Sequence, residues 1–294
     1  MIPFTAPSRP APRGARALLA TAFVALTLVT ATSPPADGRP RALASGTPTT
    51  AVRPVETMRT GPVDHLYGSP VRKIPTEEKL VALTFNAAWN ESGLDAVLKV
   101  LRQQKAPATF FLTGQFAERH PDAARSIAAA GHGIGNHSHS HPRFEVLTPA
   151  ERAQEVHDAD TAIRAATATQ PLPFFRFPYG SAPAAHVTQV NRLGYADIEY
   201  TADTNGYKGT AGGMTVQKTV TRALDALVPG EIIQMHVGSL DGHDPVLDAQ
   251  ALPQIIDALH TRGYQITDLR TLLQRENAWG TEAGTRPSGL GERS

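Results

Sequence analysis

The chain has 294 residues and is 41% apolar, which is enough to build a core and excludes a wholly disordered protein. It contains no cysteine, so disulfides, thiolate metal sites, iron–sulfur clusters, a cysteine nucleophile and a lipidated N-terminal cysteine are excluded. Its 28 basic and 27 acidic residues give a formal charge of +1. A nearly neutral chain lacks the basic surface that nucleic acids bind, so we expect no nucleic-acid partner.

The first 31 residues differ in charge from the rest of the chain. They hold three arginines and no acid, so without them 25 basic residues face 27 acidic ones, a net charge of −2. The arginines precede an apolar run over 17–30 that is short for a bilayer span, and Val29-Thr30-Ala31 fits a small-x-small cleavage site. This pattern predicts a signal peptide over 1–31 and a secreted or cell-wall protein. An uncleaved membrane anchor is the alternative.

The remaining chain divides by composition into three segments. Residues 32–75 are rich in Pro, Ala, Thr, Gly and Arg, which predicts a flexible linker whose last part, 63–74, packs on the domain edge. Residues 76–275 hold the regular apolar patterns and are the predicted domain. The tail over 276–294 is rich in Gly, Glu and Arg, and we expect it to be disordered.

Short apolar runs alternate with helical patterns through the predicted domain. A capping box at Thr148 and Glu151 marks the start of one helix, and glycines follow the ends of two others. About seven such units predict an α/β fold with a parallel sheet, either open or closed into a barrel. The expected strands are 80–85, 108–112, 132–136, 174–177, 195–201, 231–236 and 264–266, and the expected helices are 94–101, 121–130, one from 148, 183–193, 216–227, 252–260 and 269–273.

Polar side chains follow five of the predicted strands. They are Asn86, the segment 136–141, the segment 176–180, the segment 203–207 and His236. Because the carboxyl ends of parallel strands meet at one edge of the sheet, we expect these clusters to form one site.

The segment 136–141 contains three histidines, of which His137 and His141 are four residues apart. On a helical turn this spacing places two imidazoles on one face, where they can share a metal ion, whereas His139 points away. A surface histidine-rich turn without a metal is the alternative.

Asp203 and His236 can form a carboxylate–imidazole pair, which would favour the imidazolium and make His236 a general acid. The alternative is that each is an ordinary polar residue whose hydrogen bonds are made within the fold and that has no catalytic role. Arg176 precedes the turn Phe177-Pro-Tyr-Gly180, whose backbone N–H groups can face an oxyanion, although a structural salt bridge is the simpler interpretation of this arginine.

In this order, the clusters resemble the polysaccharide deacetylase family, the NodB-homology domain of carbohydrate esterase family four. The resemblance covers roughly residues 78 to 274 and implies a distorted (β/α) barrel that hydrolyses acetyl groups on glycans with a divalent metal held by one Asp and two His. The family's motifs fall on His137, Ser138 and His141; on Arg176, Pro178, Tyr179 and Gly180; on Asp203 with Tyr207 as its aromatic; and on His236 with Gln234 in place of Leu.

The first motif departs from the family pattern Thr-Phe-Asp-Asp-Gly. Here Asn86 stands where the resemblance implies the general base, and an amide does not accept a proton at neutral pH. Ala87 stands where the resemblance implies the third metal ligand. We expect Arg176 to hydrogen-bond Asn86, and Trp89, just behind the motif, to contact substrate.

Two functions follow from these residues. The first is a secreted deacetylase of a glycan such as peptidoglycan or chitin, with zinc, or cobalt as the alternative ion, held by His137 and His141. His236 would then act as the acid oriented by Asp203, and the base would be metal-bound hydroxide, Glu91 or Asp95. The second is a non-catalytic glycan-binding protein. We expect a monomer with no protein partner. A glycosidase needs two facing carboxylates, and the strand ends offer only Asp203.

Overall fold

The computed structural model describes residues 63–240, 242 and 245–274. The predicted signal peptide, most of the predicted linker and the tail over 276–294 lie outside the described residues, so these assignments stay predictions. Within the described ranges, none of the helices has the length and apolar character needed to cross a bilayer.

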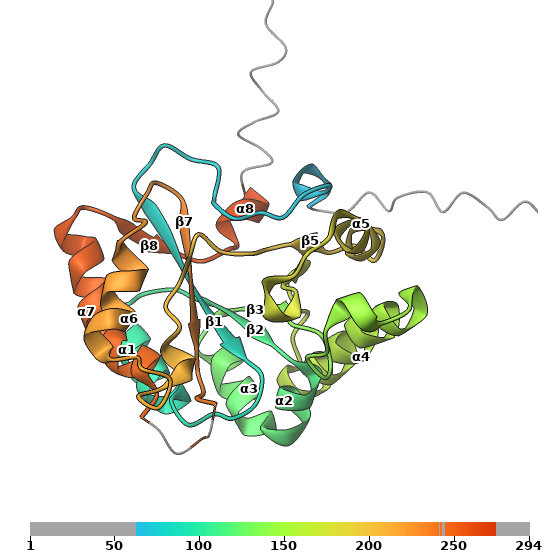
Figure 1. Ribbon diagram of the computed structural model, residues 1–294, viewed down its shortest axis with the longest axis horizontal. Coiled ribbons are helices and arrows are strands. Elements are labelled where there is room, and N and C mark those ends of the chain that lie inside the picture. The colour runs from blue at the N-terminus through green and yellow to red at the C-terminus, as the bar shows by residue number, and fades with distance from the viewer. Residues whose placement is uncertain (1–62, 241, 243–244, 275–294) are drawn as a thin grey trace, which may run out of the picture. The chain divides into compact units, whose positions relative to one another are not determined.

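The centre of the fold is one curled parallel sheet, which confirms the expected α/β class and barrel-like fold (Figure 1). Seven strands run in the order β5-β4-β3-β2-β1-β7-β6. The eighth strand, β8, pairs with residues 80–82 of β1, and β2 pairs with residues 84–87 of the same strand. The strands are β1 (Leu80–Ala87), β2 (Thr109–Leu112), β3 (Gly133–Asn136), β4 (Phe174–Phe175), β5 (Ala196–Asp197), β6 (Ala202–Asp203), β7 (Glu231–His236) and β8 (Gln265–Thr267).

Where one strand was expected over 195–201, the structure has the short strand β5 near the start of this range and a second short strand, β6, just after its end. β5 and β6 lie at opposite ends of the seven-strand order, so the chain crosses between the two edges of the curled sheet over residues 198–201. The region holds aromatic and β-branched residues that are typical of a strand, Tyr195, Ile198, Tyr200 and Thr201, and the sequence gives no sign of the crossing. The crossing explains why eight strands form where about seven were expected.

Helices cover the outside of the sheet (Figure 1), with α1, α6 and α7 on one flank of the central strands and α2, α3 and α4 on the other. The odd-numbered residues of β1 from Val81 to Ala87 belong to the core cluster beneath these helices. The predicted capping box of α4 is present, since Thr148 and Glu151 each accept the other's backbone N–H. The helices are α1 (Leu94–Gln104), α2 (Gly114–Arg119), α3 (Pro121–Ala129), α4 (Pro149–Thr167), α5 (Ala184–Arg192), α6 (Val216–Leu224), α7 (Leu247–Thr261) and α8 (Thr271–Gln274).

The inner face of the sheet is closed at one end by the chain before β1. Val63, Leu66 and Ile74 are buried in the inner apolar cluster with Ala82 of β1 and Phe111 of β2. The segment 63–74 therefore packs on the domain, as expected, and the packed part of the chain begins before the predicted domain boundary at residue 76. The opposite end of the sheet, where the strands terminate, carries the polar side chains.

Candidate active site

A cavity of about 540 Å³ opens at the carboxyl ends of the strands, as parallel-sheet geometry predicts. It gathers side chains from all five predicted clusters. Of the residues expected at the site, those that line the cavity are Asn86, Trp89, His137, His141, Tyr179, Gly180, Asp203, Tyr207 and His236. Gln234, in the place of the family's leucine, lines it as well.

Arg176 lies beneath the cavity and is completely buried. Its Nη1 donates to Asn86 Oδ1 and to Thr84 Oγ1, both at 3.0 Å, so the expected hydrogen bond to Asn86 is present. Its guanidinium carbon lies 4.0 Å from the centre of the Phe111 ring. Burial lowers the pKa of Arg176 to about 10, which still leaves the side chain charged at neutral pH. Arg176 therefore fixes the direction of the Asn86 amide.

Ala87 has a different environment from Asn86. Its side chain is fully buried in the core cluster beneath the helices, whereas its neighbours Asn86 and Ala88 line the cavity. The residue in the place of the family's metal ligand thus packs against apolar groups. The sequence shows that the carboxylate is absent, and the structure adds that the space around position 87 is filled by core side chains.

His137 and His141 come together as predicted, with ring centres 4.8 Å apart, but not on a helical turn. They lie in a loop after β3 in which Ser138 and His141 have positive φ angles of 66° and 59°. The helical geometry expected from their spacing is therefore wrong, although the proximity holds. His139 points elsewhere, and its Nε2 lies 3.9 Å from Glu118.

The two imidazoles are suitable metal ligands. His137 Nδ1 lies 2.8 Å from the Arg176 carbonyl oxygen, which fixes an Nδ1–H tautomer and leaves the Nε2 lone pair free. Burial lowers the pKa of His137 well below its usual value and that of His141 to about 4, so both rings are neutral at pH 7. Among the described residues, however, no group of three or more His, Asp or Glu can hold a metal ion. The donor set fits a weakly held divalent ion.

His236 differs from expectation in its carboxylate partner. Its Nδ1 lies 3.7 Å from Asp248 Oδ2, and its backbone N–H donates to the same oxygen at 2.9 Å. The expected pairing with Asp203 is thus replaced by a pairing with Asp248, because Asp203 Oδ1 accepts the N–H of Asn205 instead. Asp248 was not found by sequence reasoning, because the helix was expected to begin at residue 252, whereas α7 begins at Leu247 and holds Asp248 in its first turn.

Aromatic rings surround the histidines. The Tyr207 ring centre lies 4.4 Å from that of His236, and Trp89 and Tyr179 lie 5.2 Å and 4.8 Å from His141. Trp89 is 39% exposed and Tyr179 is 56% exposed, so both present apolar surface to a ligand. Pro178 is buried in the turn that carries Tyr179 and supports it from below.

Backbone strain concentrates at this end of the sheet. Six described non-glycine residues have positive φ, and four of them, Ser138, His141, Tyr179 and Asn205, are in the loops around the cavity. Such conformations cost roughly 1–3 kcal/mol each and persist where the surrounding structure holds them for function. Gly180 has a positive φ of 65° as well, a backbone conformation that favours glycine.

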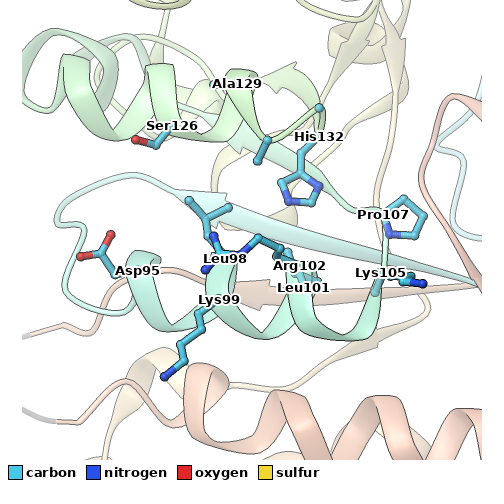
Figure 2. Close-up of a pocket in the computed structure, with 13 residues that line it drawn as sticks. Asp95, Leu98, Lys99, Leu101, Arg102, Lys105, Pro107, Ser126, Ala129 and His132 are labelled. Carbon is cyan, nitrogen blue, oxygen red and sulfur yellow. The ribbon is translucent and has the colours of Figure 1, made fainter.

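The two acids considered as replacement bases do not reach the cavity. Asp95 lines a separate groove of about 1030 Å³ between α1 and α3 (Figure 2). Glu91 lies 3.4 Å from His120, away from the cavity residues. Asp203 is the one carboxylate of the described residues in the cavity lining. The hypothesis that Glu91 or Asp95 acts as the base is therefore wrong.

Comparison with known proteins agrees with the motifs. The sequence profile of the family described as Polysaccharide deacetylase matches residues 73–198. A chitooligosaccharide deacetylase of Bradyrhizobium sp. (strain ANU 289) is 33% identical over 201 residues, which cover 65% of this chain and 90% of that protein. The chain belongs to the polysaccharide deacetylase family. Its curled sheet is the fold of this family, which includes proteins named as chitooligosaccharide and peptidoglycan deacetylases.

The polysaccharide deacetylase family includes proteins that have lost activity. The peptidoglycan-N-acetylglucosamine deacetylase of Bacillus cereus is 28% identical over 203 residues, covering 68% of this chain and 70% of that protein. The crystal structure of a pseudoenzyme from Bacillus anthracis in the same esterase family matches with a TM-score of 0.63 and 27% identity, covering 70% of this chain and 69% of the other. A mutant of that pseudoenzyme is described as having restored enzymatic activity.

Proposed function

We propose that this chain is a secreted N-deacetylase of a glycan, with peptidoglycan or chitin oligomers as the substrate class. The observation that carries the proposal is the cavity in which His236, backed by a buried carboxylate, faces two neutral imidazoles and exposed aromatic rings. The reaction cleaves the amide C–N bond with water and releases acetate and a free amine. The proposal that the protein is secreted rests on the arginines and the apolar run near the N-terminus. We also expect the protein to act as a monomer.

The residues of the cavity have separate tasks in this proposal. Trp89 and Tyr179 stack on sugar rings, and the backbone of the Tyr179 turn lies beside the acetyl oxygen. His236 gives its proton to the departing amine nitrogen. His137 and His141 would hold a divalent ion, with zinc the first candidate, which when bound polarises the acetyl carbonyl. Asp203, as the carboxylate on the cavity wall, is the available group to take a proton from the attacking water.

The second candidate function is glycan binding without hydrolysis. It is favoured by Asn86 and Ala87, which leave the site without the base and the third metal ligand of its family. The similarity to a pseudoenzyme of the same fold supports it as well. In this case the aromatic rings would bind the glycan and no acetate would be released.

Acetate release separates the two functions. The purified protein is treated with a chelator, reloaded with zinc or cobalt, and incubated with peptidoglycan, chitin oligomers and acetylated xylan. Acetate above the level of a His236→Ala control supports the deacetylase. Glycan retention with no acetate from any substrate, under every metal condition, supports the binding protein instead.

A further inference from the structure

We propose that Asp248 is the positioning residue of His236, replacing Asp203 in this role, and that Gly206 provides the space for it. This inference rests on the proposed deacetylase function for its kinetic consequence. Its structural consequence, the tautomer of His236, can be measured whether or not the protein is active.

The contacts of Asp248 fix its carboxylate between the ends of two strands. The residue is fully buried in the first turn of α7. Its Oδ1 accepts the hydroxyl hydrogen of Thr204 at 2.6 Å, and its Oδ2 accepts the backbone N–H of His236 at 2.9 Å. Because both oxygens are held, the carboxylate cannot turn away from the His236 ring.

The ring nitrogen next to this carboxylate has no other partner. His236 Nδ1 is buried and without a hydrogen bond among the described residues, and Asp248 Oδ2 is 3.7 Å away. A small rotation of the imidazole shortens this distance to that of a hydrogen bond. A bond from Nδ1–H to Asp248 leaves Nε2 as the nitrogen that exchanges a proton with the substrate.

Gly206 makes this arrangement possible. A Cβ at position 206 would lie 2.3 Å from Asp248 Oδ1 and 2.7 Å from Oδ2, closer than atoms that are not bonded approach each other. Any side chain at 206 would therefore push the carboxylate away from His236. Glycine at 206 and aspartate at 248 thus form a matched pair, although 42 residues separate them.

The negative charge of the buried Asp248 carboxylate explains why His236 is its partner. A buried carboxylate is costly unless it is hydrogen-bonded and paired with a positive group. The N-terminus of α7 offsets part of this cost, and the His236 ring supplies a positive group whenever it is protonated. The other ionisable groups that line the cavity with His236 are Asp203, His137, His141, Lys208, Tyr179, Tyr200 and Tyr207. The Tyr207 ring is tilted against the His236 ring, with 4.4 Å between the ring centres.

Asp203 serves as the matched control, because it is the other carboxylate near His236. Its Oδ1 accepts the Asn205 N–H at 2.8 Å, and its carbonyl oxygen accepts Arg222 Nε at 2.8 Å, so it stabilises the turn after β6. Asp203→Asn therefore removes a cavity charge without touching the His236 Nδ1 contact. Asp248→Asn keeps the fold, because the amide oxygen still accepts the His236 N–H and the amide NH₂ donates to Thr204.

The test is the tautomer of His236 in the ¹⁵N-histidine-labelled full chain, observed by long-range ¹H–¹⁵N spectroscopy at about pH 9, where free imidazoles are neutral. We expect an Nδ1–H ring in the wild type and in Asp203→Asn. In Asp248→Asn we expect a partial shift toward Nε2–H, because the neutral amide oxygen left beside Nδ1 is a weaker acceptor than the carboxylate. Gly206→Ala, which displaces the carboxylate without changing it, should give the same shift. In the active protein, Asp248→Asn should lower kcat about 10-fold to 100-fold with little change in KM, part of the loss expected for an absent acid.

A tautomer that changes in Asp203→Asn and not in Asp248→Asn overturns the proposal. An unchanged tautomer in both Asp248→Asn and Gly206→Ala overturns it as well. Absence of acetate release by the wild type would reject the deacetylase function, while the spectra would still decide the role of Asp248.

Discussion

Asn86 and Gln234 form an amide pair across two neighbouring strands, with Asn86 Nδ2 donating to Gln234 Oε1 at 3.1 Å. On its other side, Asn86 Oδ1 accepts from Arg176. Both polar atoms of Asn86 are thus engaged, and a carboxylate at this position has no N–H to offer Gln234. The site is matched to an amide at position 86, as expected for a redesigned motif and not for a single stray substitution.

Asn86→Asp alone should therefore lower acetate release, even though Arg176 would keep the new carboxylate ionised. The carboxylate would lose the N–H that Gln234 Oε1 now accepts, so the Gln234 amide would have to turn over to bond it, and the variant would add a negative charge to a cavity that already holds Asp203. Asn86→Asp combined with Gln234→Leu removes this conflict and restores the family residue at both positions. The double variant should exceed the single variant by at least tenfold, since a positioned base contributes about 10²–10⁴ in rate.

Initial rates at matched zinc occupancy test this expectation, with Gln234→Leu as the control. A large gain from Asn86→Asp alone would mean that the amide only replaced a lost base. No turnover from any of the four proteins would favour the glycan-binding function.

Zinc binding should depend on His137 and His141 but not on His139. The first two rings are neutral and adjacent, whereas His139 lies near Glu118. Alanine at either 137 or 141 leaves one ligand and should abolish stoichiometric binding, and His139→Ala should leave it nearly intact. Isothermal titration of the chelator-treated protein measures the stoichiometry. Equal losses in all three variants would point to an unspecific histidine-rich loop.

His236→Ala should lower kcat by about 10²–10⁴, the range for loss of one general acid. Its zinc content should not change, because its ring is paired with Asp248 and lies tilted against the Tyr207 ring. Rate measurements and metal analysis on the same preparations check both points. Loss of the metal in this variant would assign His236 as a ligand and contradict its role as the acid.

Glu231 should make the protein less stable as pH rises. Burial raises the pKa of Glu231 from 4.5 to about 7, so the folded state binds more protons than the unfolded state between these values. The free energy of unfolding therefore falls as pH rises from about 4.5 to above 7. Glu231→Gln removes the ionisation, and its amide oxygen can still accept the Val228 N–H.

Glu231→Gln should accordingly stabilise the protein at pH 8 by about 1–3 kcal/mol, and much less at pH 4.5. Urea unfolding of both proteins at the two pH values measures the difference. Equal stabilisation at both values would assign the effect to packing and not to ionisation.

Much of the fold followed from local patterns. The predicted elements lie within a few residues of β1, β7, α1 and α3. The two strands are buried on both faces and so read as continuous apolar runs, whereas the two helices bury one face and so carry apolar residues at helical spacing. The sequence also predicted that the strand-end clusters would meet in one site, because parallel strands place their carboxyl ends at one edge of the sheet. Strand composition did not reveal that the chain leaves one edge of the sheet after β5 and joins the opposite edge at β6, because connecting residues such as Ile198 and Glu199 are buried as strand residues are.

The sequence by itself determined which chemical groups the site contains: three histidines, one arginine, an aspartate and an amide in the place of an acid. Only the tertiary structure decided which of them touch. It brought His137 and His141 together through a strained loop, turned Ala87 into the core, and placed Asp248 of α7 beside His236. Such contacts depend on strand pairing and helix packing between residues far apart in the chain, and no local period in the sequence records them.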